Sequence, residues 1–183
     1  MPVRIFLLIG SAGAGKNTLI NCLLQPQSQL VYIPSFTTRD PRPGESEANP
    51  YHFISKVDFA QRITENEFFE YQEVHGNLYG TSKKEFRKII TNNQIGITDV
   101  DILGGLKIKH AWPELVTTIF IRPSDPDVLV ERLELRHSES QETLERRLKR
   151  VPLEISMENQ CDYVVINDDL EQAVDSLIKI VLL

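Results

Sequence analysis

The stretch from residue 5 to residue 20 limits the possible folds of this chain more than any other. It reads IFLLIGSAGAGKNTLI, which is an apolar run, a glycine-rich turn and a lysine that opens an amphipathic helix. An unbroken apolar run is typical of a central parallel strand, because both faces of such a strand are covered. Gly10, Gly13 and Gly15 allow a tight loop whose backbone N–H groups can point at a bound anion. The stretch therefore predicts an α/β fold with an anion site at the end of its first strand.

The same stretch nearly matches the P-loop motif G-x-x-x-x-G-K-[ST], which binds nucleotide phosphates. Lys16 stands where the motif places its lysine, at the N-terminus of a helix whose dipole favours negative charge. Asn17 departs from the motif, because it replaces the residue whose hydroxyl normally reaches magnesium. A ligand-free turn between strand and helix is the alternative, but the strand, the helix and the lysine together favour phosphate binding.

The length of 183 residues suits one domain that can bury a sizeable core. Its composition, with 41% hydrophobic and 25% charged residues, is ordinary for a globular protein. The net charge of −6 argues against a nucleic-acid or membrane partner, so cations must gather locally to hold an anionic ligand. No apolar run is long enough to cross a membrane, and the N-terminal one leads into the glycine loop rather than a cleavage site. Cys22 and Cys161 lack metal-ligand spacing, which predicts free thiols and a cytoplasmic location.

Strand-like and helix-like patterns alternate along the chain, which predicts a parallel sheet with helices packed on it. The predicted strands are 3–9, 30–33, 51–54, 68–74, 77–81, 95–101, 116–121 and 163–166. The predicted helices are 16–25, 57–66, 83–92, 126–136, a charged stretch from 136 to 155, and 170–181. The short strands between about 35 and 82 are expected to form a small lobe inserted into the α/β core.

Prolines interrupt this pattern at two places. Residues 34–44 hold two arginines among three prolines, so we expect a rigid irregular loop that presents cations, with a solvated surface turn as the alternative. Pro152 lies within a helical stripe, where it predicts a kink or break and the loss of one backbone hydrogen bond. In the helix 57–66, Phe59, Ile63 and Ala60 are expected to face inward.

Asp99 and Asp101 stand at the carboxyl end of a predicted buried strand. Ligands of open parallel sheets bind beyond these strand ends. Asp101 is therefore a candidate for a magnesium site or for a substrate contact. The alternative is a helix N-cap, which an aspartate at the start of a helix often provides.

Six motifs in sequence order together resemble the guanylate kinase family, whose members phosphorylate GMP with ATP. They are residues 10–18, 35–39 with 41–45, 67–71, 76–81, 99–101 and 167–170. The resemblance implies a P-loop NTPase-type parallel sheet flanked by helices, with an inserted small mixed α/β GMP-binding lobe and a helical lid. It also implies a single domain over 1–183, with a core of 1–34, 83–135 and 151–183, a lobe of 35–82 and a lid of 136–150.

The resemblance further implies roles for the residues at the matching positions. The ATP site would comprise Gly10, Ser11, Ala12, Gly13, Ala14, Gly15, Lys16, Asn17, Thr18 and, at the adenine, Asn167. The GMP phosphate would be held by Arg39, Arg42, Tyr51 and Tyr79, and the guanine would be read by Ser35, Glu70, Thr81 and Asp101. The catalytic cations would be Lys16, Arg39, Arg136 and Arg147, of which the last two lie in or beside the lid. Magnesium, which accompanies ATP, would lie near Asn17, Asp99 and Asp101.

The chemistry of GMP gives independent reasons for these residue types. An arginine fork can bind two oxygens of a doubly charged monophosphate. The Glu70 carboxylate can accept hydrogen bonds from guanine N1 and N2 together, whereas adenine offers no such pair of donors. We expect GMP and ATP as substrates, dGMP as a further possible acceptor, and no nucleic-acid or membrane partner. The oligomeric state is left open.

Two other functions are compatible with parts of this pattern. One is an inactive guanylate-kinase-like module that binds proteins, and the other is a kinase of a different small molecule. The module is disfavoured because all five predicted phosphate-site cations are present, namely Lys16, Arg39, Arg42, Arg136 and Arg147. The other kinase is disfavoured by Glu70.

Several positions differ from the usual family pattern. Ser11 and Ala12 replace a Pro-Ser pair in the loop, and Pro50 stands where aspartate is common. Leu103 replaces a glutamine, and His137 stands where glycine is common. These differences leave the predicted cations in place, and two of them fall next to Tyr51 and in the predicted lid.

Overall fold

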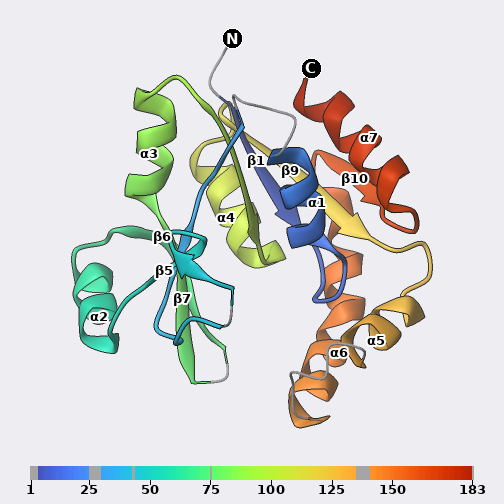
Figure 1. Ribbon diagram of the computed structural model, residues 1–183, viewed down its shortest axis with the longest axis horizontal. Helices are drawn as coiled ribbons and strands as arrows, with labels where there is room; N and C mark the ends of the chain where they lie inside the picture. The colour runs from blue at the N-terminus through green and yellow to red at the C-terminus, as the bar shows by residue number, and fades with distance from the viewer. Residues whose placement is uncertain (1–3, 25–29, 43, 75, 135–140, 183) are drawn as a thin grey trace.

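The computed structural model describes residues 4–24, 30–42, 44–74, 76–134 and 141–182. These residues form a three-layer α/β core with a small lobe at one side (Figure 1). The lobe and the pair of helices α5 (Asp127–Glu134) and α6 (Gln141–Ser156) lie on opposite sides of the core end where β1 (Arg4–Ile9) leads into the glycine loop. None of the described helices is long and apolar enough to cross a membrane.

The first strand, β1, lies in the middle of the core sheet. Within the described residues this sheet has five strands in the order β10-β9-β1-β8-β2, and all of its pairs are parallel. The other strands are β2 (Leu30–Tyr32), β8 (Ile95–Val100), β9 (Val116–Arg122) and β10 (Tyr163–Ile166). Residues 5–9 are completely or almost completely buried. The apolar run therefore forms the central strand that the sequence predicts.

Alternate residues of β1 support two hydrophobic cores, one on each face of the sheet. Phe6 and Leu8 pack with residues of α1 (Lys16–Leu24) and α7 (Leu170–Val181). Leu7 and Ile9 pack on the other face, with residues of α3 (Lys83–Thr91) and α4 (Ile102–Ala111). The sequence analysis names no helix at α4, although it allows for a helix cap at Asp101. A short 3-10 helix, Glu158–Gln160, precedes β10.

The small lobe contains its own sheet, built within residues 35–82. Its strand order is β4-β5-β3-β7-β6, with parallel and antiparallel pairs. The strands are β3 (Ser35–Thr37), β4 (Ser46–Glu47), β5 (Pro50–Phe53), β6 (Phe68–Val74) and β7 (Asn77–Ser82), and the helix is α2 (Lys56–Thr64). Phe36, Phe59 and Phe68 form its core. The lobe is therefore a mixed α/β unit.

The structure corrects part of the expectation of an irregular loop over residues 34–44, whereas residues 38–42 form no helix or strand. Residues 35–37 form β3, which pairs with β5 on one side and with β7 on the other. Its central residue, Phe36, is buried in the lobe core. Two partner strands that are distant in the sequence satisfy the backbone hydrogen-bonding groups of residues 35–37. The composition of the segment does not indicate these partners.

Two further expectations about helices are wrong. Helix α6 continues through Pro152 instead of breaking there. Val151 is buried in the core, and such packing can offset the one hydrogen bond that proline removes. In α2, Phe59 is fully buried and Ile63 packs against the lobe core, but Ala60 is exposed.

Candidate active site

The loop between β1 and α1 has the backbone conformation of a tight anion-binding turn. Gly15 has a φ of 90°, and a Cβ atom at this position would lie 2.4 Å from Asn167 Nδ2. A Cβ at Gly10 would lie only 2.2 Å from the backbone oxygen of Ile121. The neighbouring strand β9 and Asn167 therefore leave no room for a side chain at Gly10 and Gly15. This explains why glycine occupies these positions.

The cation of the loop is held close to the backbone. Lys16 Nζ donates hydrogen bonds to the carbonyl oxygens of Gly10, at 2.6 Å, and of Ser11, at 3.2 Å. Asn167 is buried and donates from Nδ2 to the carbonyl oxygen of Ala14 at 2.7 Å. Asn167, directly after β10, thus holds the loop in place through this hydrogen bond. Asn17 and Thr18 are exposed at the first turn of α1.

A second group of predicted residues comes together in the lobe. The guanidinium carbon of Arg39 lies 5.7 Å from the centre of the Tyr51 ring, and the Tyr51 and Tyr79 rings are 5.7 Å apart. Arg39 Nη2 forms an ion pair with Glu45 Oε1 at 2.9 Å. Burial would raise the pKa of Glu45, but its hydrogen bonds with Arg39 and with the Arg42 backbone outweigh burial and hold the pKa below its ordinary value.

Glu70 on β6 is partly buried beside its predicted partner on β7. Thr81 Oγ1 donates a hydrogen bond to Glu70 Oε1 at 2.6 Å. Burial raises the pKa of Glu70 above its ordinary value, and this hydrogen bond opposes only part of the shift. A Cβ at Gly104, in the first turn of α4, would lie 3.0 Å from Glu70 Cδ. The carboxylate therefore rests close against the N-terminus of α4.

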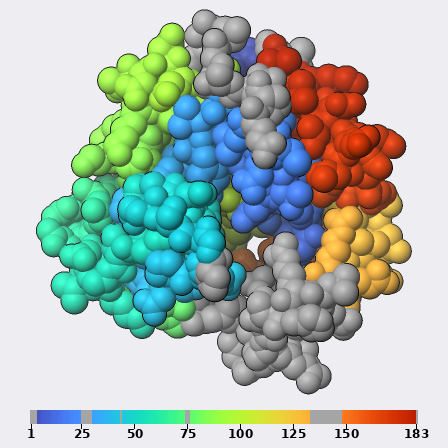
Figure 2. All heavy atoms as spheres, in the orientation of Figure 1, coloured from blue at the N-terminus to red at the C-terminus, as the bar shows by residue number. Residues whose placement is uncertain are grey.

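Asp101 is the N-cap of α4, which is the alternative that the sequence analysis left open. Its Oδ1 accepts a hydrogen bond from the Gly104 backbone N–H at 2.6 Å. Its Oδ2 lies 3.9 Å from Arg150 Nη2, so one oxygen caps the helix and the other faces a cation. Ser35 is next to Tyr51 in the register of β3 and β5. Figure 2 shows that the surface is hollowed between the small lobe and the segment that carries the phosphate loop.

Comparison with known proteins identifies the family. The sequence pattern described as guanylate kinase matches residues 3–182. The guanylate kinase of Shewanella violacea is 40% identical over 180 residues, which cover 97% of this chain and 86% of that protein. The guanylate kinase of Colwellia psychrerythraea is 40% identical over 186 residues, which cover 99% of this chain and 85% of that protein.

The crystal structure of guanylate kinase from Anaplasma phagocytophilum superimposes with a TM-score of 0.77 at 29% identity, covering 99% of this chain and 85% of that one. This chain belongs to the guanylate kinase family. Its fold is the parallel α/β sheet flanked by helices that the resemblance implies.

The donor set near the loop suits a magnesium ion that guanylate kinases would bind together with ATP. In the described part of the chain, no group of three or more His, Cys, Asp or Glu side chains could hold a metal ion by itself. Magnesium, however, usually binds one or two carboxylates and completes its shell with phosphate oxygens and water. Asp99, whose Oδ1 accepts a hydrogen bond from the Tyr32 hydroxyl at 3.2 Å, and the exposed amide of Asn17 are suitable ligands of this kind.

Both predicted lid arginines fall where the structure gives no side-chain description. Arg136 lies outside the described residues, and Arg147 belongs to α6 but its side chain is not described. The same helix contributes two residues that the sequence analysis missed, Arg150 and Glu154. Their spacing of four residues is a helical signal, but the stretch is so rich in charge that a solvated face was the more obvious interpretation.

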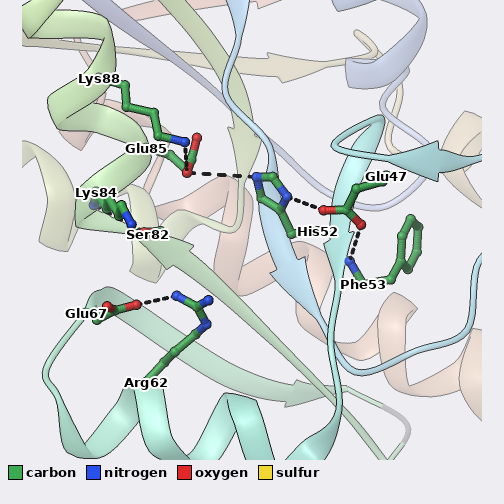
Figure 3. A network of polar contacts seen from close by, with 9 residues as sticks. All are labelled: Glu47, His52, Phe53, Arg62, Glu67, Ser82, Lys84, Glu85 and Lys88. Atoms are coloured by element: carbon green, nitrogen blue, oxygen red, sulfur yellow. Dashed lines mark hydrogen bonds and ion pairs between the residues drawn. The ribbon is translucent and has the colours of Figure 1, made fainter.

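Sequence analysis also missed the polar network that anchors β5 (Figure 3). His52 donates from Nδ1 to Glu47 Oε1 at 2.5 Å, and its Nε2 lies 3.9 Å from Glu85 Oε1 on α3. The hydrogen bond with His52 lowers the pKa of Glu47. Figure 3 also shows the Arg62–Glu67 ion pair, which ties α2 to the start of β6. The hydrogen bond of His52 ties β5, and with it Tyr51, to β4, and it places the other ring nitrogen of His52 near α3.

Proposed function

We propose that this chain transfers the γ-phosphoryl group of ATP to GMP, giving ADP and GDP. It is an ATP:GMP phosphotransferase, a nucleoside monophosphate kinase of the guanylate kinase family. One observation carries the proposal beyond family membership. The chain combines a tight phosphate loop with a separate lobe that holds both the partly buried carboxylate of Glu70 and the phosphate-binding residue types Arg39, Tyr51 and Tyr79.

The acceptor of the reaction needs little chemical activation. The attacking group is an anionic phosphate oxygen of GMP, so no general base is needed, and catalysis depends on positioning and on neutralising charge. We assign Lys16 and the loop amides to the ATP phosphates, and Arg39, Arg42, Tyr51 and Tyr79 to the GMP phosphate. Burial raises the pKa of Tyr51, which keeps its hydroxyl protonated as a hydrogen-bond donor.

The guanine base is the second element of the proposal. Glu70 in its ionised form accepts hydrogen bonds from N1 and N2 of guanine, while Thr81 holds the carboxylate in place. Ser35 and Asp101 are assigned to the same base. Adenine would leave the buried carboxylate without these donors, which costs about 1–3 kcal/mol or more.

The remaining assignments complete the arrangement. We assign the lobe of residues 35–82 to GMP, and the segment of residues 136–150 to a lid whose Arg136 and Arg147 approach the transferring phosphoryl group. Asn167 supports the ATP site, and Asn17 and Asp99 would hold magnesium, whereas Asp101, with one oxygen on the α4 N-terminus and the other facing Arg150, is left to the base. When bound, the ion supplies positive charge to the phosphates. Both cysteines are free, which suits the proposed cytoplasmic location.

A coupled assay of ADP release tests the proposal. ATP is supplied with GMP, AMP, UMP or CMP in turn, and GMP is expected to be preferred by about 10–100-fold or more. Equal rates with and without GMP would contradict the proposal and favour the inactive protein-binding module. That module has no support from the curated relatives named above, which are all guanylate kinases.

The magnesium assignment has its own test. Asn17→Ser restores the hydroxyl of the usual motif, so the activity of this variant should saturate at a lower magnesium concentration than that of the parent. ATP affinity without magnesium, measured by calorimetry, should be the same for both proteins. Identical magnesium titrations would show that position 17 does not contact the ion.

A further inference from the structure

The C-terminal half of α6 connects the phosphate loop to the end of β8. Glu154 Oε2 accepts a hydrogen bond from Ser11 Oγ at 2.5 Å. The other oxygen of Glu154 lies 3.8 Å from Arg150 Nε, and Arg150 Nη2 lies 3.9 Å from Asp101 Oδ2. Asp101 in turn caps α4 through the Gly104 N–H. A chain of polar contacts therefore runs from the ATP side of the site, across one turn of α6, to the GMP side.

The two ends of this chain of contacts differ in their exposure to water. Ser11 is only 3% exposed, so its hydrogen bond with Glu154 is shielded from water and geometrically well defined. The Arg150 side chain is 48% exposed, and an exposed ion pair contributes little to stability. The effect of the Arg150 charge is instead local, because this charge offsets the negative charges of Glu154 and Asp101 near the place where anionic phosphates must bind.

The Ser11 contact joins the phosphate loop to α6. The Ser11 hydroxyl is a donor for the Glu154 carboxylate, and the hydrogen bond joins residues 143 positions apart in the sequence. The loop and α6 are therefore linked directly in this chain.

Positions 147, 150 and 154 have the spacing i, i+3 and i+7, so they share one face of α6. The contacts of Arg150 and Glu154 thus fix the rotation of the helix at the position of the proposed lid arginine. We propose that Glu154 and Arg150, anchored by Ser11, are positioning residues for phosphoryl transfer. They orient α6 against both nucleotide sites. This inference rests on the proposed function.

Kinetics of single and double variants test the inference. Arg150→Gln and Glu154→Ala should each lower kcat about tenfold, since small displacements of catalytic groups cost rate, while KM for both nucleotides changes less than about threefold. Ser11→Ala should lower kcat less, by about threefold, and Ser11→Ala with Glu154→Ala should be no slower than Glu154→Ala alone. Arg150→Lys keeps the charge and should retain most of the activity.

Two controls separate positioning from loss of folded protein. The kcat is expressed per GMP-binding site counted by calorimetry, so unfolded molecules do not enter the rate. Lys149→Gln removes one positive charge from the adjacent, exposed position of α6 and should leave kcat unchanged. If Glu154→Ala does not fold, Ser11→Ala and Arg150→Gln decide the question alone.

The outcomes are distinct. Equal kcat values for Arg150→Gln and Lys149→Gln, or independent effects of the Ser11 and Glu154 substitutions, would overturn the inference while the parent remains active. A parent protein that does not turn over ATP in response to GMP would instead overturn the proposed function itself.

Discussion

The phosphate loop and the lobe of residues 35–82 present their cations on different kinds of structure. In the loop, the backbone is confined by β9 and Asn167, and Lys16 is held by two carbonyl oxygens of the loop. In the lobe, Arg39 is held by Glu45 and His52 by Glu47, which are side-chain pairs near the surface. The loop is therefore organised before any ligand arrives. If the lobe binds GMP as proposed, Arg39 must exchange or share its ion pair with Glu45, so we expect the two regions to respond differently to substitution.

The largest effect is expected from the loop cation. Lys16→Met removes the charge that we assign to the ATP phosphates, and kcat should fall by about 10²–10³-fold, as for the loss of one preorganised charge at a transition state. Stopped assays of ADP release measure this loss. GMP affinity, measured by calorimetry, should stay within about twofold of the parent. A variant that lost only GMP affinity would contradict the separate roles of the loop and the lobe.

Next in size is the effect of Glu70→Gln on the GMP side. The glutamine amide places an N–H donor where the carboxylate offered an acceptor oxygen, opposite the N1 and N2 donors of guanine. We therefore expect kcat/KM for GMP to fall about 10–100-fold while KM for ATP is unchanged. Because burial raises the pKa of Glu70, its carboxylate gains a proton at a higher pH than an exposed glutamate does. GMP affinity of the parent should therefore fall as the pH is lowered through this raised pKa. The GMP phosphate titrates in both proteins, so the difference between their pH profiles isolates Glu70.

The raised pKa of Glu70 also affects stability. Its effect on stability depends on pH in the opposite direction from its effect on GMP affinity. A raised pKa in the folded state means that folding favours the protonated form, so this stability is complete at low pH and is lost as the pH rises through the raised value. Above the raised pKa, the ionised and partly buried carboxylate lowers the stability of the folded protein. Glu70→Gln should raise the melting temperature by about 2–4 °C in scanning calorimetry. A lower melting temperature would indicate that the carboxylate stabilises the lobe.

A moderate effect is expected from the contact between the lobe and α4. In Gly104→Ala the new methyl group meets Glu70 Cδ and Cγ at 3.0 Å, which displaces the carboxylate, so KM for GMP should rise about tenfold. Gly105→Ala is the matched control, because its methyl group would meet Ile9 at 2.4 Å and not Glu70. The control should lower the melting temperature without changing selectivity for GMP. Equal KM values for GMP in the two variants would show that Gly104 has no role in guanine recognition.

The smallest effect should come from Glu45→Gln, which weakens the ion pair with Arg39. Exposed and partly exposed pairs contribute at most about 1 kcal/mol, so stability should fall by no more than this amount. The pKa of Glu45 is lowered in the folded protein, so its contribution is present above the unfolded pKa and lost as the pH falls through the folded value. At pH 7, KM for GMP should change by less than about threefold, because the phosphate replaces the carboxylate as the partner of Arg39. A tenfold change would mean that Glu45 orients Arg39 for GMP.

The reach of sequence analysis differs between these two regions for a physical reason. The strand, loop and helix from Ile5 to Ile20 are one local unit, and period, glycine placement and Lys16 specify it within 16 consecutive residues. The lobe strand around Phe36 is extended because β5 and β7 lie on either side of it, so its composition alone misleads. Pro152 remains within a helix for a similar reason, since its neighbour Val151 is buried in the core.

The amino-acid sequence by itself determined the α/β class, the phosphate loop and, through an ordered set of motifs, the family. Tertiary structure decided which side chains meet across the chain. Asp101 caps α4 while it faces Arg150, and Ser11 donates a hydrogen bond to Glu154, which lies 143 positions away in the sequence. Glycine turns and hydrophobic periods are properties of neighbouring residues, whereas these pairings exist only after the sheet has aligned the ends of its strands and α6 has packed beside them.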